Sequence, residues 1–236
     1  CIRDRGGAVE CTIIRRLNRF VIEILVGNRR AKAYINNTGR LTEYIIRGRK
    51  AYCVENPRAR KTEYRLFAVS ERGLGVLIDT QIQMKSFERA VSMDIIPWLR
   101  GCKIVGRNLR LGSSRIDYLL YCMGKHIYVE VKSAVLRGSE HYAMYPDCPT
   151  IRGRRHINEI INHVLMGGLG AIVFIAALPH VKAFKPCARG DPVIPVLVRR
   201  ACEVGVMVKA ISLHYDPRSS LVNLDNPDLE VELDDK

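Results

Sequence analysis

The sequence predicts an α/β (α+β) protein with a small N-terminal β-barrel and a C-terminal mixed sheet flanked by helices. Two observations support this prediction. Short apolar runs separated by Gly, Pro and Asn occupy the first third of the 236 residues. Helical and strand patterns then alternate through the remainder, as in sheets covered by helices. We therefore expect two domains, 1–85 and 86–236.

The first domain contains five strand candidates bounded by turn residues. Five short strands in about eighty residues fit the oligonucleotide-binding (OB) barrel, although another small β-barrel would produce the same pattern. The candidates are Phe20–Val26, Arg30–Ile35, Ala51–Val54, Glu63–Val69 and Gly75–Asp79.

The second domain is predicted to contain a hairpin followed by a β-α-β unit, which implies a mixed sheet. Ser86 is the expected N-cap of its first helix. The segment after Asp216 is acidic and is expected to be a mobile end. The predicted elements are a helix at Ser86–Leu99, strands at Lys103–Leu109, Ile116–Cys122 and Ile127–Leu136, a helix at Arg154–Met166, a strand at Ala171–Leu178, a helix at Pro192–Val204 and a strand at Val206–His214.

The charge balance indicates a nucleic-acid partner. There are 38 Lys and Arg residues against 24 Asp and Glu residues, a formal net charge of +14, and residues 1–85 carry +10 of it (18 basic minus 8 acidic). A positive body of this size attracts phosphate polymers. A thermophile surface rich in ion-pair networks is the alternative, but such networks need acids near parity with bases. The charge alone does not choose between single-stranded DNA, double-stranded DNA and RNA.

The cysteines and apolar runs favour a cytoplasmic protein without a membrane span. None of the eight cysteines forms a C-x-x-C pair, and Cys122 and Cys202 are expected to pack as small hydrophobes in a mostly reduced chain. The first 20 residues are too charged for a secretion signal. The apolar run Ile160–Leu178 is interrupted by Asn162, His163 and glycines, so we expect a helix end, a turn and a buried strand. The oligomeric state is not predicted.

A candidate metal site lies on two strands predicted to form a hairpin. Side chains alternate faces along a strand, so Glu130 and Lys132 share one face, and pairing across Gly124 would bring Asp117 towards them. Two carboxylates in apolar strands need a compensating partner. Mg²⁺ or Mn²⁺ is the expected cofactor, held by Asp117 and Glu130, with Lys132 orienting the attacking water. The alternative is a surface strand whose charges face water.

Much of the chain resembles the sugar fermentation stimulation protein family. The matching motifs follow the family's order and are together highly specific. They are Arg16–Phe20, Asn37–Leu41, Ile78–Gln81, Gly112–Leu120, Val129–Ser133, Tyr145–Thr150 and Arg152–His156.

The resemblance implies an OB-like barrel joined to a PD-(D/E)XK nuclease-like domain, DNA binding without strong sequence preference, and a regulatory role in sugar (maltose) metabolism. It also implies that the core of the nuclease-like site is Asp117, Glu130 and Lys132. The motif residues around this core would be Arg115, Asp147, Arg152 and His156. Asn108 stands where the family usually has Glu, so a third acidic ligand is missing at that position.

Candidate nucleic-acid contacts lie in both domains. Arg16, Arg19 and Arg40 alternate with aromatic residues in the barrel, a pattern suited to stacking on single strands, although Phe20 is better explained as core. Arg152 and His156 lie near a predicted helix start, where backbone N–H groups favour phosphate. Together with Arg115, these are the residues that we expect to contact DNA.

Three functions are compatible with the sequence. The first is a Mg²⁺-dependent endonuclease or phosphodiesterase of the PD-(D/E)XK type. The second is a non-specific DNA-binding transcriptional regulator that does not cleave. The third is an adaptor whose basic surface binds RNA. Metal-dependent cleavage separates the first from the others, and the preferred polymer separates the second from the third.

Overall fold

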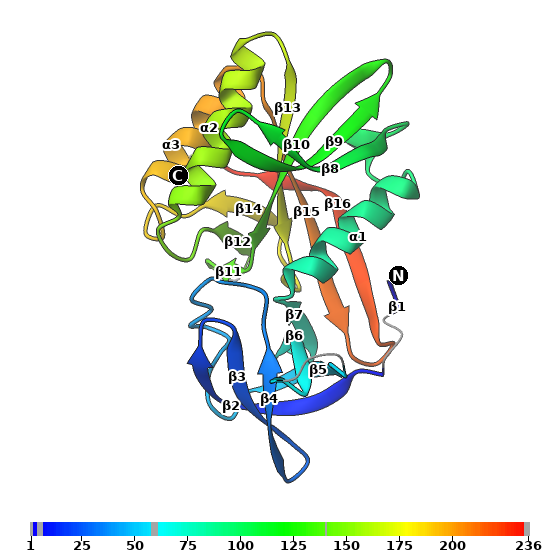
Figure 1. Ribbon diagram of the computed structural model, residues 1–236, viewed down its shortest axis with the longest axis vertical. Helices are drawn as coiled ribbons and strands as arrows, with labels where there is room; N and C mark the ends of the chain where they lie inside the picture. Colours follow the sequence, from blue (N-terminus) through cyan, green and yellow to red (C-terminus); the bar gives the residue numbers. More distant parts are fainter. Residues whose placement is uncertain (1, 4–6, 58–60, 140, 234–236) are drawn as a thin grey trace. The chain divides into compact units, whose positions relative to one another are not determined.

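The computed structural model describes residues 2–3, 7–57, 61–139 and 141–233, which fall into two compact units (Figure 1). The first unit lies within residues 1–86 and also contains 177–179 and 213–225. The second contains 87–176, 180–212 and the segment from residue 226 onwards. The end of β15 and the start of β16, residues 213–225, therefore belong to the first unit.

A closed five-stranded barrel forms most of the first unit. The strands are β2 (Val9–Asn18), β3 (Val21–Val26), β4 (Arg29–Tyr34), β5 (Lys50–Glu55) and β6 (Tyr64–Glu71). They pair in the order β2-β3-β4-β6-β5 and back to β2, and only the β4–β6 pair is parallel. This is the strand order 1-2-3-5-4-1 of an OB barrel, so the expected fold is confirmed.

The predicted number of barrel strands was right, but one of the five predicted strands, Gly75–Asp79, lies outside the barrel. The strand β2 was missed because its outward positions carry Arg and Glu, while Cys11 and Ile13 point into the core. The predicted strand at Gly75–Asp79 corresponds to β7 (Leu74–Leu77), which pairs with β6 and β15 outside the barrel. Near the N-terminus, β1 (Ile2–Arg3) pairs with β16.

The second unit contains the expected mixed sheet. Its strands run in the order β8 (Lys103–Leu111), β9 (Ser114–Cys122), β10 (Lys125–Ala134), β13 (Leu169–Ala176) and β15 (Met207–Asp216). The first two pairings are antiparallel and the last two are parallel. The strand β13 is almost entirely buried, as expected for a central strand with both faces covered.

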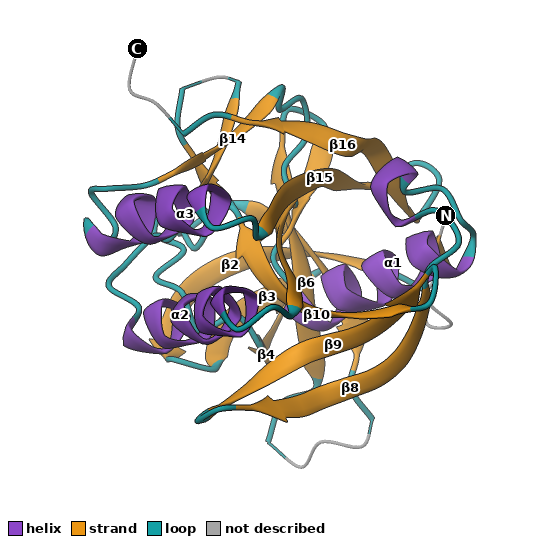
Figure 2. Ribbon diagram, turned by 90° about the horizontal axis from the view of Figure 1, so that it is seen from above, coloured by secondary structure: helices purple, strands orange, loops and turns teal. Residues whose placement is uncertain are grey.

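Two helices cover one face of this sheet. The helix α2 (Ile151–Leu165) connects β10 to β13, and α3 (Val193–Glu203) connects β14 to β15. The two helices lie side by side, and α2 packs on β10 and β13 (Figure 2). Buried Ile157, Ile160 and Ile161 form the inner face of α2. The predicted mixed sheet flanked by helices is therefore confirmed.

The first helix starts earlier than predicted. We expected Ser86–Leu99, but α1 spans Thr80–Ser92, and a short 3-10 helix follows at Pro97–Leu99. Ser86 is not its N-cap, because the Asp79 carboxylate accepts hydrogen bonds from the Gln81 and Ile82 amides at 2.9 and 3.0 Å. The Ser86 hydroxyl instead donates to the Ile82 carbonyl within the helix.

The acidic C-terminal segment was expected to be a mobile end, but its described part forms a strand, and residues 234–236 lie outside the described residues. A second small sheet contains β11 (Leu136–Arg137), β12 (Tyr142–Tyr145), β14 (Ala183–Pro186) and β16 (Leu221–Val231), in that order. The strand β16 was not predicted because its sequence is rich in acidic residues. Val222 and Leu229 are nevertheless buried, and the backbone of β16 pairs with β14. No helix in the described part of the chain is long and apolar enough to cross a membrane.

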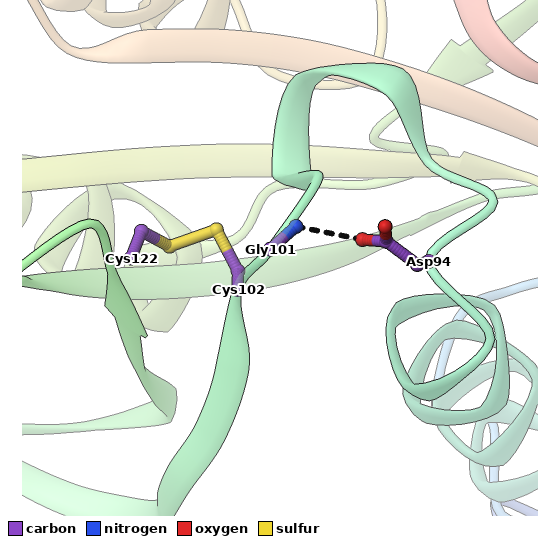
Figure 3. The surroundings of a disulfide bond; sticks show 4 residues. All are labelled: Asp94, Gly101, Cys102 and Cys122. Atoms are coloured by element: carbon purple, nitrogen blue, oxygen red, sulfur yellow. Dashed lines mark hydrogen bonds between the residues drawn. A yellow bond between two sulfur atoms is a disulfide. The ribbon is translucent and has the colours of Figure 1, made fainter.

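The expectations for the two cysteines Cys122 and Cys202 were wrong. Cys122 forms a disulfide with Cys102 (Figure 3), and Cys202 is exposed rather than packed in the core. The antiparallel pairing of β8 with β9 places Lys103 opposite Tyr121. Cys102 precedes Lys103 and Cys122 follows Tyr121, so the two cysteines meet at the end of the hairpin. Their sequence separation of 20 residues gave no sign of this contact.

Candidate metal centre and nucleic-acid interface

Asp117 and Glu130 meet where β9 pairs with β10. Tyr118 lies opposite Val129 in this antiparallel pair, so Asp117 and Glu130 follow as the next neighbours. The Asp117 carboxylate reaches along β10 and accepts a hydrogen bond from the Val131 amide at 2.8 Å. The predicted hairpin therefore brings the two acids together.

Glu130 is the centre of a buried polar cluster. Its side chain is about 3% exposed, and its Oε1 atom lies 2.6 Å from Lys132 Nζ and 2.6 Å from His156 Nδ1. Among the described residues, no group hydrogen-bonds its second oxygen, Oε2, although that atom is buried. A buried carboxylate oxygen without a partner is costly, so this atom is a candidate ligand for a cation.

His156 links this cluster to the first turn of α2. Its side chain is buried, and Arg152 Nε donates to its Nε2 atom at 3.3 Å. Because Nε2 accepts that bond, the ring proton resides on Nδ1 and is donated to Glu130. The imidazole thus orients the Glu130 carboxylate, and Arg152 in turn orients the imidazole.

The pKa values of the three core residues reflect burial and mutual charge. Burial, followed by the negative charge of Glu130, raises the pKa of Asp117 to about 6. Burial also acts to raise the pKa of Glu130, but Lys132 and His156 outweigh it and hold that pKa below its ordinary value. Burial acts to lower the pKa of Lys132, yet Glu130 keeps it above its ordinary value. At neutral pH the cluster holds two carboxylates and one ammonium group.

Arg115 lies outside this buried cluster. It is exposed on β9, and its guanidinium donates to the Asn108 carbonyl at 3.1 Å. Asn108 has a φ of 53°, a left-handed conformation that Asn tolerates better than most residues. Asn108 is exposed on the neighbouring strand β8, so Arg115 is tied to the position at which the resemblance led us to expect an acid. Asp147 is half-buried in the loop before α2.

The three predicted arginines of the barrel have different environments. The half-buried Arg16 guanidinium donates to the carbonyl oxygens of Asn18, Arg19, Gly39 and Arg40, at distances of 2.7 to 3.2 Å. Arg16 therefore joins the β2–β3 turn to the 39–40 segment. The side chains of Arg19 and Arg40 are exposed on the two segments that it joins.

The aromatic residues beside these arginines also differ from one another. Phe20 was expected to be core, but it is 45% exposed, with the Arg19 guanidinium 5.8 Å from its ring centre. Tyr34 is half-buried, whereas Tyr44 is buried in the barrel. Phe20 is exposed because it lies in the two-residue turn between β2 and β3, where alternation along a strand does not apply.

Three supporting residues were not predicted from the sequence. Glu159 on α2 accepts hydrogen bonds from the amide and hydroxyl of Ser113 in the β8–β9 turn, at 2.8 and 2.6 Å. Asp191 is buried and binds the Arg154 guanidinium through both oxygens at 2.8 and 3.0 Å. The Tyr145 hydroxyl lies against Gly153, where an added Cβ would be 2.4 Å from it. Of these three residues, only Tyr145 could have been found from the sequence, because it belongs to the Tyr145–Thr150 motif of the family resemblance.

Fold and site together define a class of protein. An OB barrel is linked to an α/β unit whose strands β9 and β10 carry the acids, and whose following helix supplies His156. A family model described as "Sugar fermentation stimulation protein RE domain" matches residues 81–219. A second, "SfsA N-terminal OB domain", matches residues 14–78.

The chain belongs to the sugar fermentation stimulation protein family. A homolog from Pyrococcus furiosus is 46% identical over 213 residues, covering 90% of this chain and 91% of the relative. One from Archaeoglobus fulgidus is 46% identical over 224 residues, covering 95% of each. The solved structure of Pyrococcus furiosus SfsA in complex with Ca²⁺ superimposes with a TM-score of 0.92 at 42% identity, covering 98% of this chain and all of that one.

Proposed function

We propose that this protein binds DNA and cleaves its phosphodiester backbone with a divalent cation held by Asp117 and Glu130. The observation that carries the proposal is the buried Oε2 atom of Glu130, which no described group hydrogen-bonds, beside a second carboxylate. In this proposal residues 1–85 serve as a nucleic-acid-binding barrel and residues 86–236 as the nuclease-like domain. We also propose a cytoplasmic location, where DNA is accessible to the protein.

The donor set fits a magnesium-type ion. Within the described ranges there is no group of three or more His, Cys, Asp or Glu residues arranged to hold a metal. Mg²⁺ is commonly bound by one or two carboxylates and fills its other positions with water and substrate phosphate. Mn²⁺ accepts the same ligands. The Ca²⁺ complex of the Pyrococcus furiosus relative, whose ion also prefers oxygen ligands, supports this choice.

The surrounding residues have distinct proposed roles. A divalent cation, when bound, makes its water more acidic and offsets the charge of the phosphate. Lys132 is an ammonium group at neutral pH because its pKa is raised, so it orients the water and phosphate through hydrogen bonds rather than taking a proton. His156 holds Glu130 in position, and the exposed Arg152 guanidinium can reach a phosphate.

Exposed arginines provide the proposed DNA contacts. Arg19 and Arg40 in the barrel, and Arg115 and Arg152 in the nuclease-like unit, are exposed and can pair with phosphate oxygens. Phe20 adds an exposed ring on which a base of a single strand can stack. Arg16 supports the two barrel contacts indirectly, because its guanidinium holds the segments that carry Arg19 and Arg40.

A metal-dependent cleavage assay tests the proposal. Single-stranded DNA, double-stranded DNA and RNA would be incubated separately with the protein and Mg²⁺ or Mn²⁺. We expect cleavage of DNA that stops with a chelator and with Glu130→Gln. Glu203→Gln, an exposed position at the end of α3, is the matched control and should cleave as the wild type does. A Glu130→Gln protein as active as this control would contradict the assignment.

A DNA-binding regulator without cleavage activity is the second candidate. It is favoured by Asn108, which stands where the family usually has an acid and whose amide side chain is a poorer metal ligand than a carboxylate. For this candidate, DNA binding would persist while no substrate is cut with either metal, and Asn108→Glu would be the variant that restores cleavage. A role in sugar metabolism belongs to this candidate.

A further inference from the structure

Two buried cysteines face each other in the wall of the barrel. Cys11 lies on β2 and Cys53 on β5, and their sulfur atoms are 2.6 Å apart and hydrogen-bonded. Cys11 is 4% exposed and Cys53 is not exposed at all. The two thiols belong to the same compact unit, so their contact does not depend on the placement of the other unit.

The strand register explains why these thiols meet. In the antiparallel β2–β5 pair, Val9 lies opposite Cys53 and Cys11 lies opposite Ala51. The two cysteines are therefore diagonal neighbours on one face of the sheet, and their sulfur atoms are in contact there. Their strands form the seam at which the first barrel strand returns to the fourth, so the contact joins segments 42 residues apart.

We propose that Cys11 and Cys53 form a second disulfide, which covalently closes the barrel between β2 and β5. Two observations point to this bond: the separation of the sulfur atoms, and their burial in an apolar wall without a metal-binding group among the described residues. The Cys102–Cys122 disulfide of the other unit is a separate bond and would be the first of two.

The oxidant in this proposal is a small-molecule disulfide such as that of a glutathione-type thiol. The thiolate of one cysteine attacks a sulfur of this disulfide, which releases one small thiol and leaves a mixed disulfide. The second cysteine then attacks the protein sulfur of that mixed disulfide and releases the other small thiol. Two protein thiols are oxidised, one small disulfide is reduced to two thiols, and no other product forms.

Burial determines when this exchange takes place. The hydrogen bond to Cys11 and burial both raise the pKa of the Cys53 thiol, so little thiolate exists in the folded barrel. The bond should therefore form while the chain folds, before the seam between β2 and β5 closes. Once formed, it should resist reduction until the protein is unfolded.

Peptide mapping tests the bond directly. The full-length protein would be refolded in a buffer containing the small disulfide and its thiol, alkylated, and digested with trypsin without reduction. Cleavage at Arg and Lys places Cys11 in peptide 6–15 and Cys53 in peptide 51–58. We expect these two peptides to appear linked in the mass spectrum, and to separate after reduction.

The Cys102–Cys122 disulfide supplies an internal control, because it links peptides 101–103 and 116–125. If the Cys102 and Cys122 peptides are linked while Cys11 and Cys53 are both alkylated, the proposal is overturned. Linkage of Cys11 to any cysteine other than Cys53 would also overturn it.

Thermal unfolding provides an independent measurement. In a Cys102→Ala/Cys122→Ala background, reduction under denaturing conditions followed by refolding with reductant should lower the unfolding midpoint by about 10 °C relative to the oxidised protein. The difference should disappear when Cys11→Ala and Cys53→Ala are added. Cys202→Ala, at an exposed cysteine, should leave the difference between the oxidised and reduced midpoints unchanged. An equal midpoint in both redox states would contradict the bond.

Discussion

At the scale of single residues, the candidate site is held together by opposing charges around one oxygen atom. Oε1 of Glu130 is bound by both Lys132 and His156, whereas Oε2 has no hydrogen-bond partner among the described groups. Asp117 adds a second carboxylate, and burial, followed by the negative charge of Glu130, raises its pKa to about 6. Without a cation the cluster is therefore strained electrostatically, and a cation should stabilise it.

Asp117→Asn should stabilise the metal-free protein at pH 8 by about 2–3 kcal/mol, because a shift of one pKa unit corresponds to about 1.4 kcal/mol. The folded-state pKa of Asp117 is raised, so ionisation destabilises the fold as pH rises through about 6, and no penalty remains below about 4. Asn keeps an oxygen for the Val131 amide. Urea unfolding with a chelator at pH 8 and pH 4 measures the effect.

The pH dependence is the control for this prediction. The advantage of Asn over Asp should vanish at pH 4, and added Ca²⁺ or Mg²⁺ at pH 8 should stabilise the wild type but not the variant. Destabilisation by the substitution at both pH values would show that Asp117 is not under electrostatic strain.

Lys132→Met should destabilise the protein by about 3–5 kcal/mol, because it leaves the charge of Glu130 buried without its ammonium partner. Adding Glu130→Gln should recover most of that loss, since the uncompensated charge is then removed. Urea unfolding of the two single variants and the double variant measures this coupling. Lys125→Met, at the exposed first residue of β10, is the matched control and should change little. Additive effects of the two site substitutions would contradict the pairing.

At the scale of elements, the register of β9 with β10 and the first turn of α2 decide the site. Period-two alternation was sufficient to place Glu130 and Lys132 on one face and to predict their approach to Asp117. It could not show that His156, 26 residues further along, would bind Glu130. That contact depends on the packing of α2 against β10, which no local pattern encodes.

The contribution of the α1 N-cap, Asp79, to the free energy of unfolding can be tested by substitution. Asp79→Ala removes the carboxylate that accepts from the Gln81 and Ile82 amides and also binds Arg65 Nε at 3.0 Å. We expect a loss of about 2 kcal/mol or more, since capping alone contributes about 1. Asp79→Asn retains the capping oxygen and should lose less. Thermal and urea unfolding compare the two, and equal losses would assign the effect to charge rather than capping.

At the scale of the whole molecule, the net charge of +14 should make DNA affinity depend steeply on salt. The joint substitution Arg19→Ala/Arg40→Ala should reduce the slope of log affinity against log salt by about 2, one for each lost phosphate contact. Fluorescence anisotropy with a labelled oligonucleotide at several salt concentrations measures the slope. Arg218→Ala, which also removes exposed positive charge from the first unit, is the control. A slope unchanged in the double variant would exclude both arginines from the interface.

The sequence by itself determined the local features of this protein: its basic charge, a five-stranded barrel joined to a mixed sheet, and the shared face of Glu130 and Lys132. These follow from composition and from the two-residue period of strands. Only the tertiary structure decided which distant groups meet. It supplied β2 as the barrel's first strand, the bond from His156 to Glu130, the strand formed by the acidic C-terminal segment, and both cysteine contacts. The physical reason is that such contacts depend on strand register and helix packing, which arise from the burial of the whole core rather than from any short segment.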